Sequence, residues 1–197
     1  YWNPLVIDGD TVRYWGFHPI VGRSVRELDG KGHIVKNIFT SMLCIIGSTN
    51  CFTIKRIGFE NINIVGVNQY LMSCGMGSND IDFVMEECYF TGVIVDSNCR
   101  DNETSYGLGK LFNNAIVRNC YVDLVIKSKT DSSITHFGCL SDIYTEAKIE
   151  NCYATGEAIS ARIKSPFGYE GNVQSCFWDS DKIKVNQGLG KGTGLPT

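Results

Sequence analysis

The sequence predicts an all-β protein built as a right-handed parallel β-helix, a solenoid of about six coils. Two observations predict this fold: a short unit returns at intervals of 19, 31, 32, 32 and 24 residues, and a glycine-bearing segment recurs at a similar spacing. Self-similarity at such a period is typical of stacked repeats. The units are short, β-branched and punctuated by glycine, which is a poor match for solenoids of helix pairs. In a parallel β-helix each unit forms one coil, and coils stack about 4.8 Å apart.

The recurring unit is clearest at residues 147–156, where Cys152 follows Asn151 and precedes Tyr153. The position of Cys152 is called the slot below, and slot side chains are predicted to form a ladder in the core. The slot residues are Ile38, Ile57, Cys88, Cys120, Cys152 and Cys176. An apolar residue stands three positions before each slot: Val35, Ile54, Met85, Val117, Ile149 and Val173. The residue directly before the slot is Asn37, Asn119 or Asn151 in three copies and Arg56, Glu87 or Ser175 in the others. The unit is therefore predicted to be a strand, an Asn-centred bend and a second strand.

The glycine-bearing segment predicts a third strand in each unit. It lies at residues 75–77, 107–109, 138–140 and 168–170. Each copy has an apolar or aromatic residue close by on its N-terminal side: Met72, Tyr106, Phe137 and Phe167.

Three regions are predicted along the chain. Residues 1–27 lack the unit and are rich in aromatic residues, so they are expected to cap the open end of the solenoid, with an aromatic platform for a sugar as the alternative. Residues 28–181 hold the repeats. Residues 182–197 are glycine-rich and are expected to form a loose tail or a linker. Polar inserts expected to be surface loops lie at 79–82, 96–104 and 128–133.

Composition argues against two classes of function. The chain has 197 residues, of which 43% are hydrophobic and 20% charged, as is ordinary for one soluble unit. A net charge of −3, without a basic cluster, argues against a nucleic-acid partner. The longest apolar run, residues 42–46, is too short for membrane insertion. Because the chain opens on Tyr1 rather than Met, it is expected to be a mature product or an excised piece.

The chain holds nine cysteines, an odd number, and four of them occupy the slot. A disulfide framework is one interpretation. Slot side chains in register stand parallel, however, and the geometry of a disulfide between them would be strained. Cysteine also packs well as a small buried hydrophobe. A reduced thiol ladder is therefore expected, which favours assembly in a reducing cytoplasm.

Carboxylate pairs are the only candidates for catalysis or metal binding. Two of the pairs, Asp80 with Asp82 and Asp179 with Asp181, could supply acid–base chemistry, but each lies in a turn-rich stretch. All three pairs could supply oxygen ligands for Ca²⁺, but none carries the further ligands of a defined site. The pairs are Asp8 with Asp10, Asp80 with Asp82, and Asp179 with Asp181. The three histidines, His18, His33 and His136, are scattered along the chain. No catalytic residue, metal or cofactor is therefore expected.

The best candidate site follows from strand geometry. If the slot residue points inward, the next residue along an extended strand points outward. The aromatic residues in this place are predicted to form an exposed column whose flat faces suit sugar rings or a partner protein. These residues are Tyr89, Tyr121, Tyr153 and Phe177. The alternative is that a loop or another chain covers the column as ordinary packing.

The sequence resembles a known family at several of these segments. The run Asn151-Cys152-Tyr153-Ala154-Thr155-Gly156, residues 107–109, and the ending at 176–179 and 192–195 resemble repeats of the GLUG type, found in bacterial surface adhesins and related β-helical proteins. Residues 28–38 resemble an early coil of pectate-lyase-like β-helices. The resemblance covers roughly residues 28–195, and it implies a fold more than a function. Residues 162–164 are similar to a short motif of polygalacturonase-like hydrolases, but the Asp-Asp pair and Gly-His-Gly of that family are missing.

These observations and the resemblance lead to an expected function. The chain is expected to be a non-catalytic structural or binding module on an extracellular appendage, either a bacterial surface adhesin or a phage tail or baseplate protein. A thiol-rich core favours a virion protein, whereas the family resemblance favours an adhesin. Expected partners are a cell-surface glycan or protein receptor and other chains of a larger assembly. The alternative is a β-helical lyase or hydrolase that cleaves a surface polysaccharide, which would require carboxylates from different coils to converge in one groove.

Overall fold

The computed structural model describes most of the region in which repeats are predicted. The described residues are 26–40, 52–66, 83–96, 107–109, 111, 114–115, 116–137, 147–168, 171–185 and 191–197, with short strands at 6–7, 11–12, 20–21, 46–48, 72–74 and 104–106. These residues form strands and turns and include no helix, so none of them belongs to a helix that could cross a membrane. The predicted all-β class is confirmed for this part of the chain.

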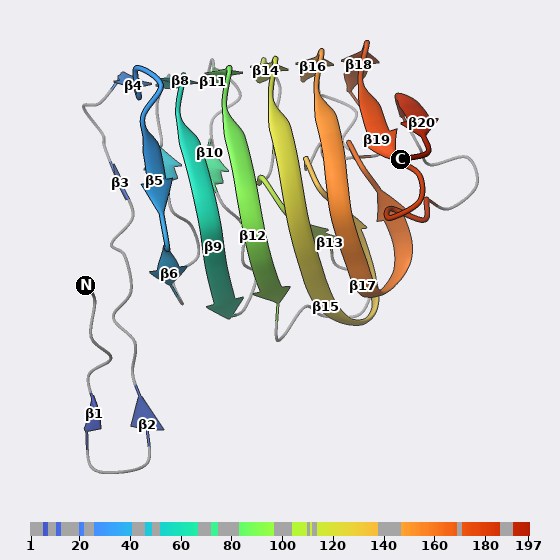
Figure 1. The fold of residues 1–197 in the computed structure, drawn as a ribbon, viewed down its shortest axis with the longest axis horizontal. Coiled ribbons are helices and arrows are strands. Elements are labelled where there is room, and N and C mark those ends of the chain that lie inside the picture. Colours follow the sequence, from blue (N-terminus) through green and yellow to red (C-terminus); the bar gives the residue numbers. More distant parts are fainter. Residues whose placement is uncertain are drawn as a thin grey trace.

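Two parallel sheets dominate the described residues (Figure 1). The six-stranded sheet contains β4 (Glu27–Asp29), β8 (Phe52–Lys55), β11 (Phe83–Glu86), β14 (Ile116–Arg118), β16 (Lys148–Glu150) and β18 (Asn172–Gln174). The main path of the nine-stranded sheet contains β5 (Ile34–Lys36), β9 (Gly58–Gly66), β12 (Tyr89–Asp96), β15 (Tyr121–Thr135), β17 (Tyr153–Ser165), β19 (Phe177–Asp179) and β20 (Thr193–Leu195). Its two side strands are β6 (Phe39–Thr40) and β13 (Thr104–Tyr106). Successive repeats each add one strand to both large sheets.

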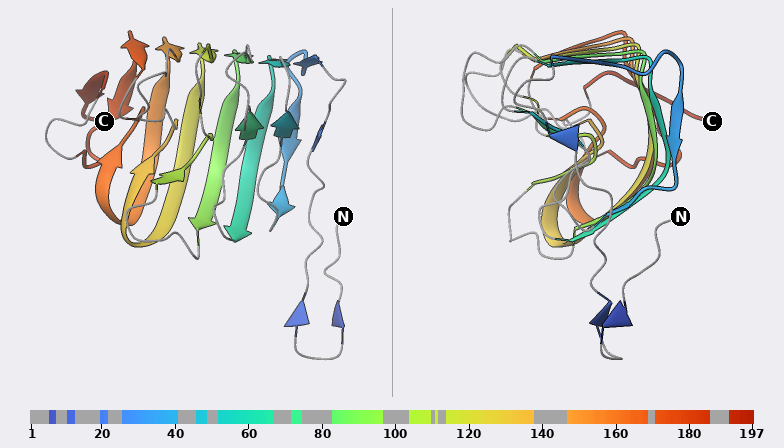
Figure 2. Two further views of the ribbon diagram at one scale, coloured as in Figure 1. Left: turned by 180° about the vertical axis from the view of Figure 1, so that it is seen from behind. Right: turned by 90° about the vertical axis from the view of Figure 1, so that its left-hand side faces the viewer.

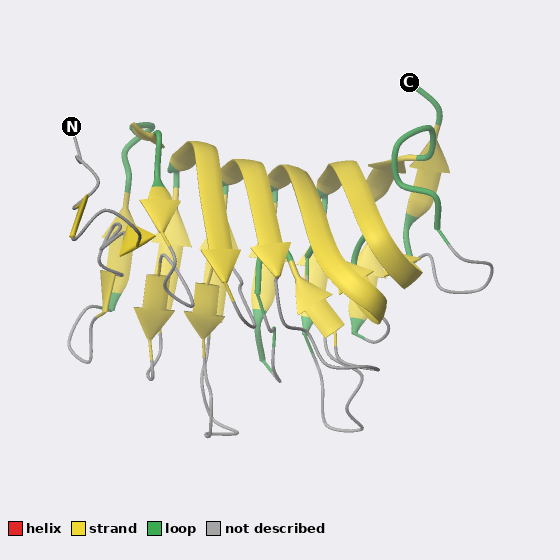
Figure 3. Ribbon diagram, turned by 90° about the horizontal axis from the view of Figure 1, so that it is seen from below, coloured by secondary structure: helices red, strands yellow, loops and turns green. Residues whose placement is uncertain are grey.

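Two smaller sheets complete the described strands. A three-stranded parallel sheet holds β3 (Ile20–Val21), β7 (Ile46–Ser48) and β10 (Met72–Cys74). The hairpin of β1 (Val6–Ile7) and β2 (Thr11–Val12) is antiparallel. The end view in Figure 2 superposes the strands of successive repeats, and Figure 3 shows them side by side along the molecule.

A left-handed residue makes the bend between the two large sheets. The residue directly before the slot has a positive φ of 51–54° in five successive repeats: Arg56, Glu87, Asn119, Asn151 and Ser175. Asparagine visits this conformation more readily than other residues with a Cβ. The Nδ2 of Asn151 also donates a hydrogen bond of 3.3 Å to the Oδ1 of Asn119. The predicted Asn-centred bend is confirmed, and other residues adopt the same bend at a conformational cost.

Replacing Glu87 by Asn is expected to stabilise the chain. Glu87 has a φ of +53° and is exposed, and a left-handed residue with a Cβ costs roughly 1–2 kcal/mol. Glu87→Asn and Glu87→Gly are therefore expected to raise the free energy of unfolding by about 0.5–1 kcal/mol. Urea denaturation would measure the change. Glu86→Asn, one position earlier in β11, is the control, and a gain of the same size there would contradict this explanation.

The interior is built from ladders of side chains in register. The apolar residues two positions before the bend, together with Leu28 of the first repeat, pair strand by strand in the order Leu28, Ile54, Met85, Val117, Ile149 and Val173. The rings of Phe59 and Phe90 stack at a centroid distance of 5.2 Å. Thr135 and Ser165 are the last paired residues of β15 and β17. Two residues after them, the ring centroids of Phe137 and Phe167 lie 5.0 Å apart. These apolar and aromatic ladders place like side chains of successive repeats in contact.

Two ladders alternate in chemistry from one repeat to the next. On the outer face of the six-stranded sheet, neighbouring strands present opposite charges in the order Asp29, Lys55, Glu86, Arg118 and Glu150. Arg118 and Glu86 form an ion pair at 3.0 Å, and Lys55 lies 3.9 Å from Asp29. In the nine-stranded sheet, large residues alternate with glycine in the order Ile62, Gly92, Leu124 and Gly156. A Cβ at Gly92 would lie 2.2 Å from the carbonyl oxygen of Ile62, so the backbone approach there requires glycine.

The first repeat corrects the predicted alignment. Ile38 is buried, but it does not precede Ile57 in the slot ladder: Val35 pairs with Phe59, and the N–H of Asn63 donates to the carbonyl of Ile38. Leu28 instead takes the place opposite Ile54. Gly30 lies against Ile57, and there is no room for a side chain at this position, because a Cβ would lie 2.5 Å from the Cβ of Ile57. The predicted 19-residue step is therefore wrong, because the first repeat turns through glycine rather than through an apolar slot residue.

Three further expectations concern segments outside the ladders. Residues 128–133 lie within β15, so the predicted loop is a continuation of the strand with a register shift. In the predicted tail, β20 adds a strand beside β19, and Ile183 is buried. A loose segment was expected here because the sequence is rich in glycine. The parallel pairing of β20 with β19 orders residues 193–195 in spite of this composition. Residues 79–82 and most of the predicted cap at 1–27 lie outside the described residues, as do the glycine segments at 75–77 and 138–140.

Candidate binding surface on the nine-stranded sheet

The structure brings the four predicted aromatic residues together on one column. Tyr89 pairs with Tyr121, Tyr121 with Tyr153, and Tyr153 with Phe177, each as the first residue of its strand. The three tyrosines are half-buried, and Phe177 is 40% exposed. These four residues are called the aromatic column below. The alternation of inward and outward side chains after the slot gives the column its position.

The ring planes differ from the expected flat platform. The rings of Tyr121 and Tyr153 are stacked, with centroids 5.8 Å apart and an angle of 4° between their planes. One face of each ring is therefore turned toward the other ring. Burial raises the pKa of both tyrosines, so their hydroxyl groups stay protonated at neutral pH. This part of the column can offer ring edges and hydroxyl groups to a ligand.

Tyr89 is held by a glycine and a carboxylate. Its ring fills the space above Gly58, its neighbour in register, where a Cβ would lie 2.2 Å from the ring. Its hydroxyl donates a hydrogen bond of 2.6 Å to the Oε1 of Glu60, and this bond raises the pKa of Tyr89 to about 12. The Oε2 of Glu60 also lies 2.6 Å from the ammonium of Lys36. These contacts fix the orientation of Tyr89 at one end of the column.

Acidic and hydroxyl side chains run beside the aromatic column. They stand two residues further along the strands, and therefore on the same face. In register, Lys36 pairs with Glu60, Thr91 with Asp123, and Asp123 with Thr155. Thr155 is buried, and the half-buried side chains Glu60, Thr91 and Asp123 are called the polar column below. Together the two columns offer apolar ring surface beside hydrogen-bond acceptors.

Asp179 has a structural role that sequence reasoning missed. Its side chain is 1% exposed, and its Oδ1 accepts the N–H groups of Asp181 and Lys182 at 3.0 and 3.2 Å. Its Oδ2 accepts the hydroxyls of Thr155 and Thr197 at 3.0 and 3.2 Å. Burial acts to raise the pKa of Asp179, but these hydrogen bonds outweigh it and lower the pKa. The Asp179–Asp181 pair therefore organises the turn after β19, while the pairs Asp8–Asp10 and Asp80–Asp82 lie outside the described residues.

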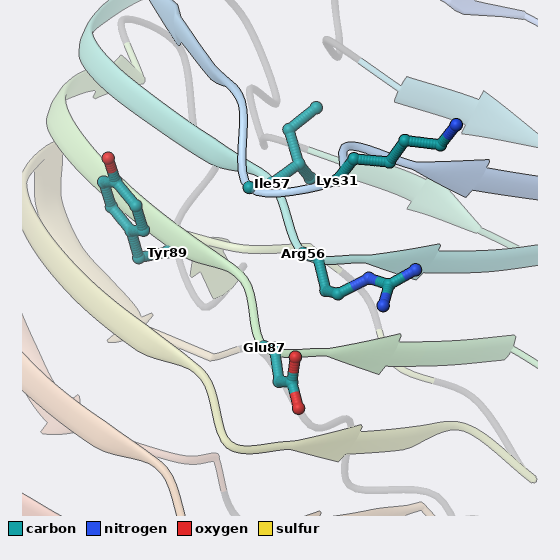
Figure 4. A pocket seen from close by; sticks show the side chains of 6 residues that line it. Lys31, Arg56, Ile57, Glu87 and Tyr89 are labelled. Atoms are coloured by element: carbon teal, nitrogen blue, oxygen red, sulfur yellow. The ribbon is translucent and has the colours of Figure 1, made fainter.

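An open pocket lies at the Tyr89 end of the aromatic column (Figure 4). It has a volume of about 530 Å³ and is lined by Lys31, Gly32, Arg56, Ile57, Glu87 and Tyr89. The Nε of Arg56 donates a hydrogen bond of 3.0 Å to Asp29, and this interaction lowers the pKa of Asp29 to about 2. This pocket was not predicted from the sequence; the feature that could have indicated it is Gly32, where an added Cβ would meet no atom within 4 Å. The aromatic column therefore ends at a concave surface with charged side chains, Lys31, Arg56 and Glu87.

The histidines and cysteines have contrasting environments. His33 is exposed, and His18 lies outside the described residues. His136 is fully buried, and among the described residues neither ring nitrogen has a hydrogen-bond partner. The four slot cysteines are buried and free of disulfides: Cys88, Cys120, Cys152 and Cys176. Within the described residues, no three or more His, Cys, Asp or Glu side chains are grouped around a common point as metal ligands would be.

No family model, curated protein or solved structure matches this chain.

Proposed function

We propose that the chain is a right-handed parallel β-helix that serves as a non-catalytic binding module on an extracellular appendage, and that its outer face binds an elongated, neutral cell-surface glycan. The appendage is that of a bacterial adhesin of the GLUG-repeat type or of a phage tail. The observation that carries the proposal is the register of the aromatic column, which places four aromatic side chains on successive strands. Three steps of about 4.8 Å give a column about 14 Å long, which suits a chain-like ligand.

The polar column supports a sugar as the ligand. The apolar C–H groups of a sugar ring pack against exposed aromatic surface, while its hydroxyls need hydrogen-bond acceptors and donors nearby. Asp123 and Thr91 supply such groups two residues further along the strands from Tyr121 and Tyr89. The carboxylate of Asp123 favours a neutral sugar over an anionic one, since like charges repel at short range.

The test is a comparison of glycan binding between two double variants. Tyr121→Ala with Tyr153→Ala removes the stacked pair, and we expect at least a tenfold loss of affinity, about 1.4 kcal/mol. Arg118→Ala with Glu150→Ala is the matched control, because these residues lie on the same two repeats but on the outer face of the six-stranded sheet. A glycan array identifies the ligand, calorimetry measures its affinity, and circular dichroism confirms folding.

The outcomes separate this proposal from its rivals. Equal affinities of the two folded variants would exclude the aromatic column as the binding surface. Loss of binding to a protein receptor, without glycan binding by the wild type, would replace the glycan with a protein partner. New reducing ends or unsaturated products in a glycan digest would show that the chain is an enzyme.

A further inference from the structure

The four slot cysteines form a continuous column of sulfur atoms in the interior. Each precedes a member of the aromatic column by one residue, so the pairing of Tyr89, Tyr121, Tyr153 and Phe177 places the cysteines directly before adjacent strands. All four side chains are at most 3% exposed. The N–H of Cys152 lies 3.4 Å from the Sγ of Cys176, so the last two members are in contact. The four residues Cys88, Cys120, Cys152 and Cys176 are called the thiol column below.

Carbonyl oxygens surround the thiol column. Each thiol donates a hydrogen bond of 3.1–3.2 Å to the carbonyl two residues earlier: Glu86, Arg118, Glu150 and Gln174. A second carbonyl from the preceding repeat lies 3.4 Å from Cys176 and 3.8 Å from Cys120 and Cys152. Hydrogen bonds with Cys152 and Cys88, together with burial, raise the pKa of the Cys120 thiol. The column thus consists of soft sulfur atoms and electronegative oxygens, an environment that favours a cation.

The spacing of the column matches one coordination geometry. Strands lie about 4.8 Å apart, and parallel side chains in register keep this separation. A metal–thiolate bond is about 2.3 Å long, so a linear sulfur–metal–sulfur unit spans about 4.6 Å. Four sulfurs in a line cannot converge on one tetrahedral ion. Linear coordination between neighbouring sulfurs therefore fits the column, whereas a zinc site does not.

We propose that each pair of consecutive thiols in the column binds one soft monovalent metal ion, such as Cu(I), in two-coordinate geometry. Thiolate and thioether sulfur select such soft ions. Each ion that binds displaces one proton to solvent, so a single ion lies between one thiolate and one neutral thiol. When all three gaps are filled, three sulfurs are thiolates, the two interior sulfurs each bridge two ions, and one terminal sulfur stays a neutral thiol. One ion and one thiolate leave the site without net charge, which avoids the cost of a buried charge. The three gaps are Cys88–Cys120, Cys120–Cys152 and Cys152–Cys176.

Native mass spectrometry with Ag⁺ tests the proposal. Ag⁺ is a soft monovalent probe that does not undergo redox cycling. The reduced full chain is equilibrated with Ag⁺ and a weak thioether competitor and is then desalted, and the bound ions are counted. Cys120→Ala removes two gaps, whereas Cys88→Ala and Cys176→Ala each remove one. We expect the central variant to lose two ions and each terminal variant to lose one, and the five cysteines outside the column are the same in all variants.

The contrast between central and terminal positions makes the result decisive. A loss of one ion in every variant would show that thiols bind independently, and this would overturn the proposal. An unchanged count in all folded variants would place the bound ions at other cysteines and would also overturn it. Cys152→Ala is a second central variant with the same expectation, should Cys120→Ala fail to fold. X-ray absorption of the loaded wild type should show two sulfur neighbours for each ion, and three or more would contradict the linear geometry.

Discussion

Lowering the pH from 6.5 to 4 is expected to remove about 3 kcal/mol of stability through one residue, His136. Its imidazole is fully buried, and burial lowers its pKa from 6.5 to about 4, although nearby backbone groups of Leu124 and Glu157 act in the opposite direction. Between these two pH values the unfolded chain binds a proton at His136 and the folded chain does not. Folding is therefore opposed as the pH falls through this window, and a difference of this size corresponds to about 3 kcal/mol.

Urea denaturation at pH 7 and at pH 4 would measure this effect. In His136→Leu, the part of the pH dependence that comes from His136 should vanish, while stability at pH 7 should stay the same or rise, since no polar group then lies buried without a partner. His33→Leu is the control at an exposed histidine. If wild type and His136→Leu lose the same stability on acidification, His136 does not titrate as a buried group.

Replacing Asp179 by Ala is expected to cost about 3 kcal/mol. The change leaves the N–H groups of Asp181 and Lys182 and the hydroxyl of Thr155 without their acceptor. Each buried polar group left unpaired costs about 1–3 kcal/mol, and water can reach only part of this turn. Asp179→Asn keeps one acceptor oxygen and should cost less than Asp179→Ala.

Thermal unfolding would rank these variants, with Asp123→Ala as the control on the neighbouring polar column. A loss of equal size in Asp123→Ala would mean that surface charge, rather than the hydrogen bonds of Asp179, sets the stability of this end. If Asp179 were instead a catalytic acid, its removal would leave stability unchanged or increased and would abolish cleavage of a polysaccharide.

Local patterns in the sequence predicted the parts of the fold that depend on strand periodicity. The outward place of Tyr121 and Tyr153 follows from the buried slot one residue earlier, and the bends at Asn119 and Asn151 follow from the preference of asparagine for a left-handed backbone. The same preference misled the alignment of the first repeat. Asn37 and Asn61 also have positive φ values, of 59° and 54°, and the Nδ2 of Asn61 bonds to the Oδ1 of Asn37. The two kinds of bend share one sequence signature, so Ile38 could not be separated from the slot.

Other features of the site depend on contacts between distant segments. The orientation of Tyr89 follows from the missing side chain of Gly58, which lies 31 positions earlier in the sequence. The burial of Asp179 follows from Thr155 and Thr197 on either side of it. Neither relation leaves a periodic trace in the sequence, because each pairs two unlike residues only once. Periodicity therefore gave the position of the candidate surface, and tertiary packing gave its shape.

The alternation of opposite charges on the six-stranded sheet and of glycine with large residues in the nine-stranded sheet limits how this chain could have grown during evolution. Both patterns return to their starting state after two repeats. Loss of the single repeat that carries Glu86 and Gly92 would bring Lys55 beside Arg118. It would also bring Ile62 beside Leu124, where neighbouring backbones now approach each other closely through glycine. Gain or loss of two repeats preserves both patterns. The smallest duplication that preserves both patterns is therefore a pair of repeats, twice the length of the period that the sequence displays.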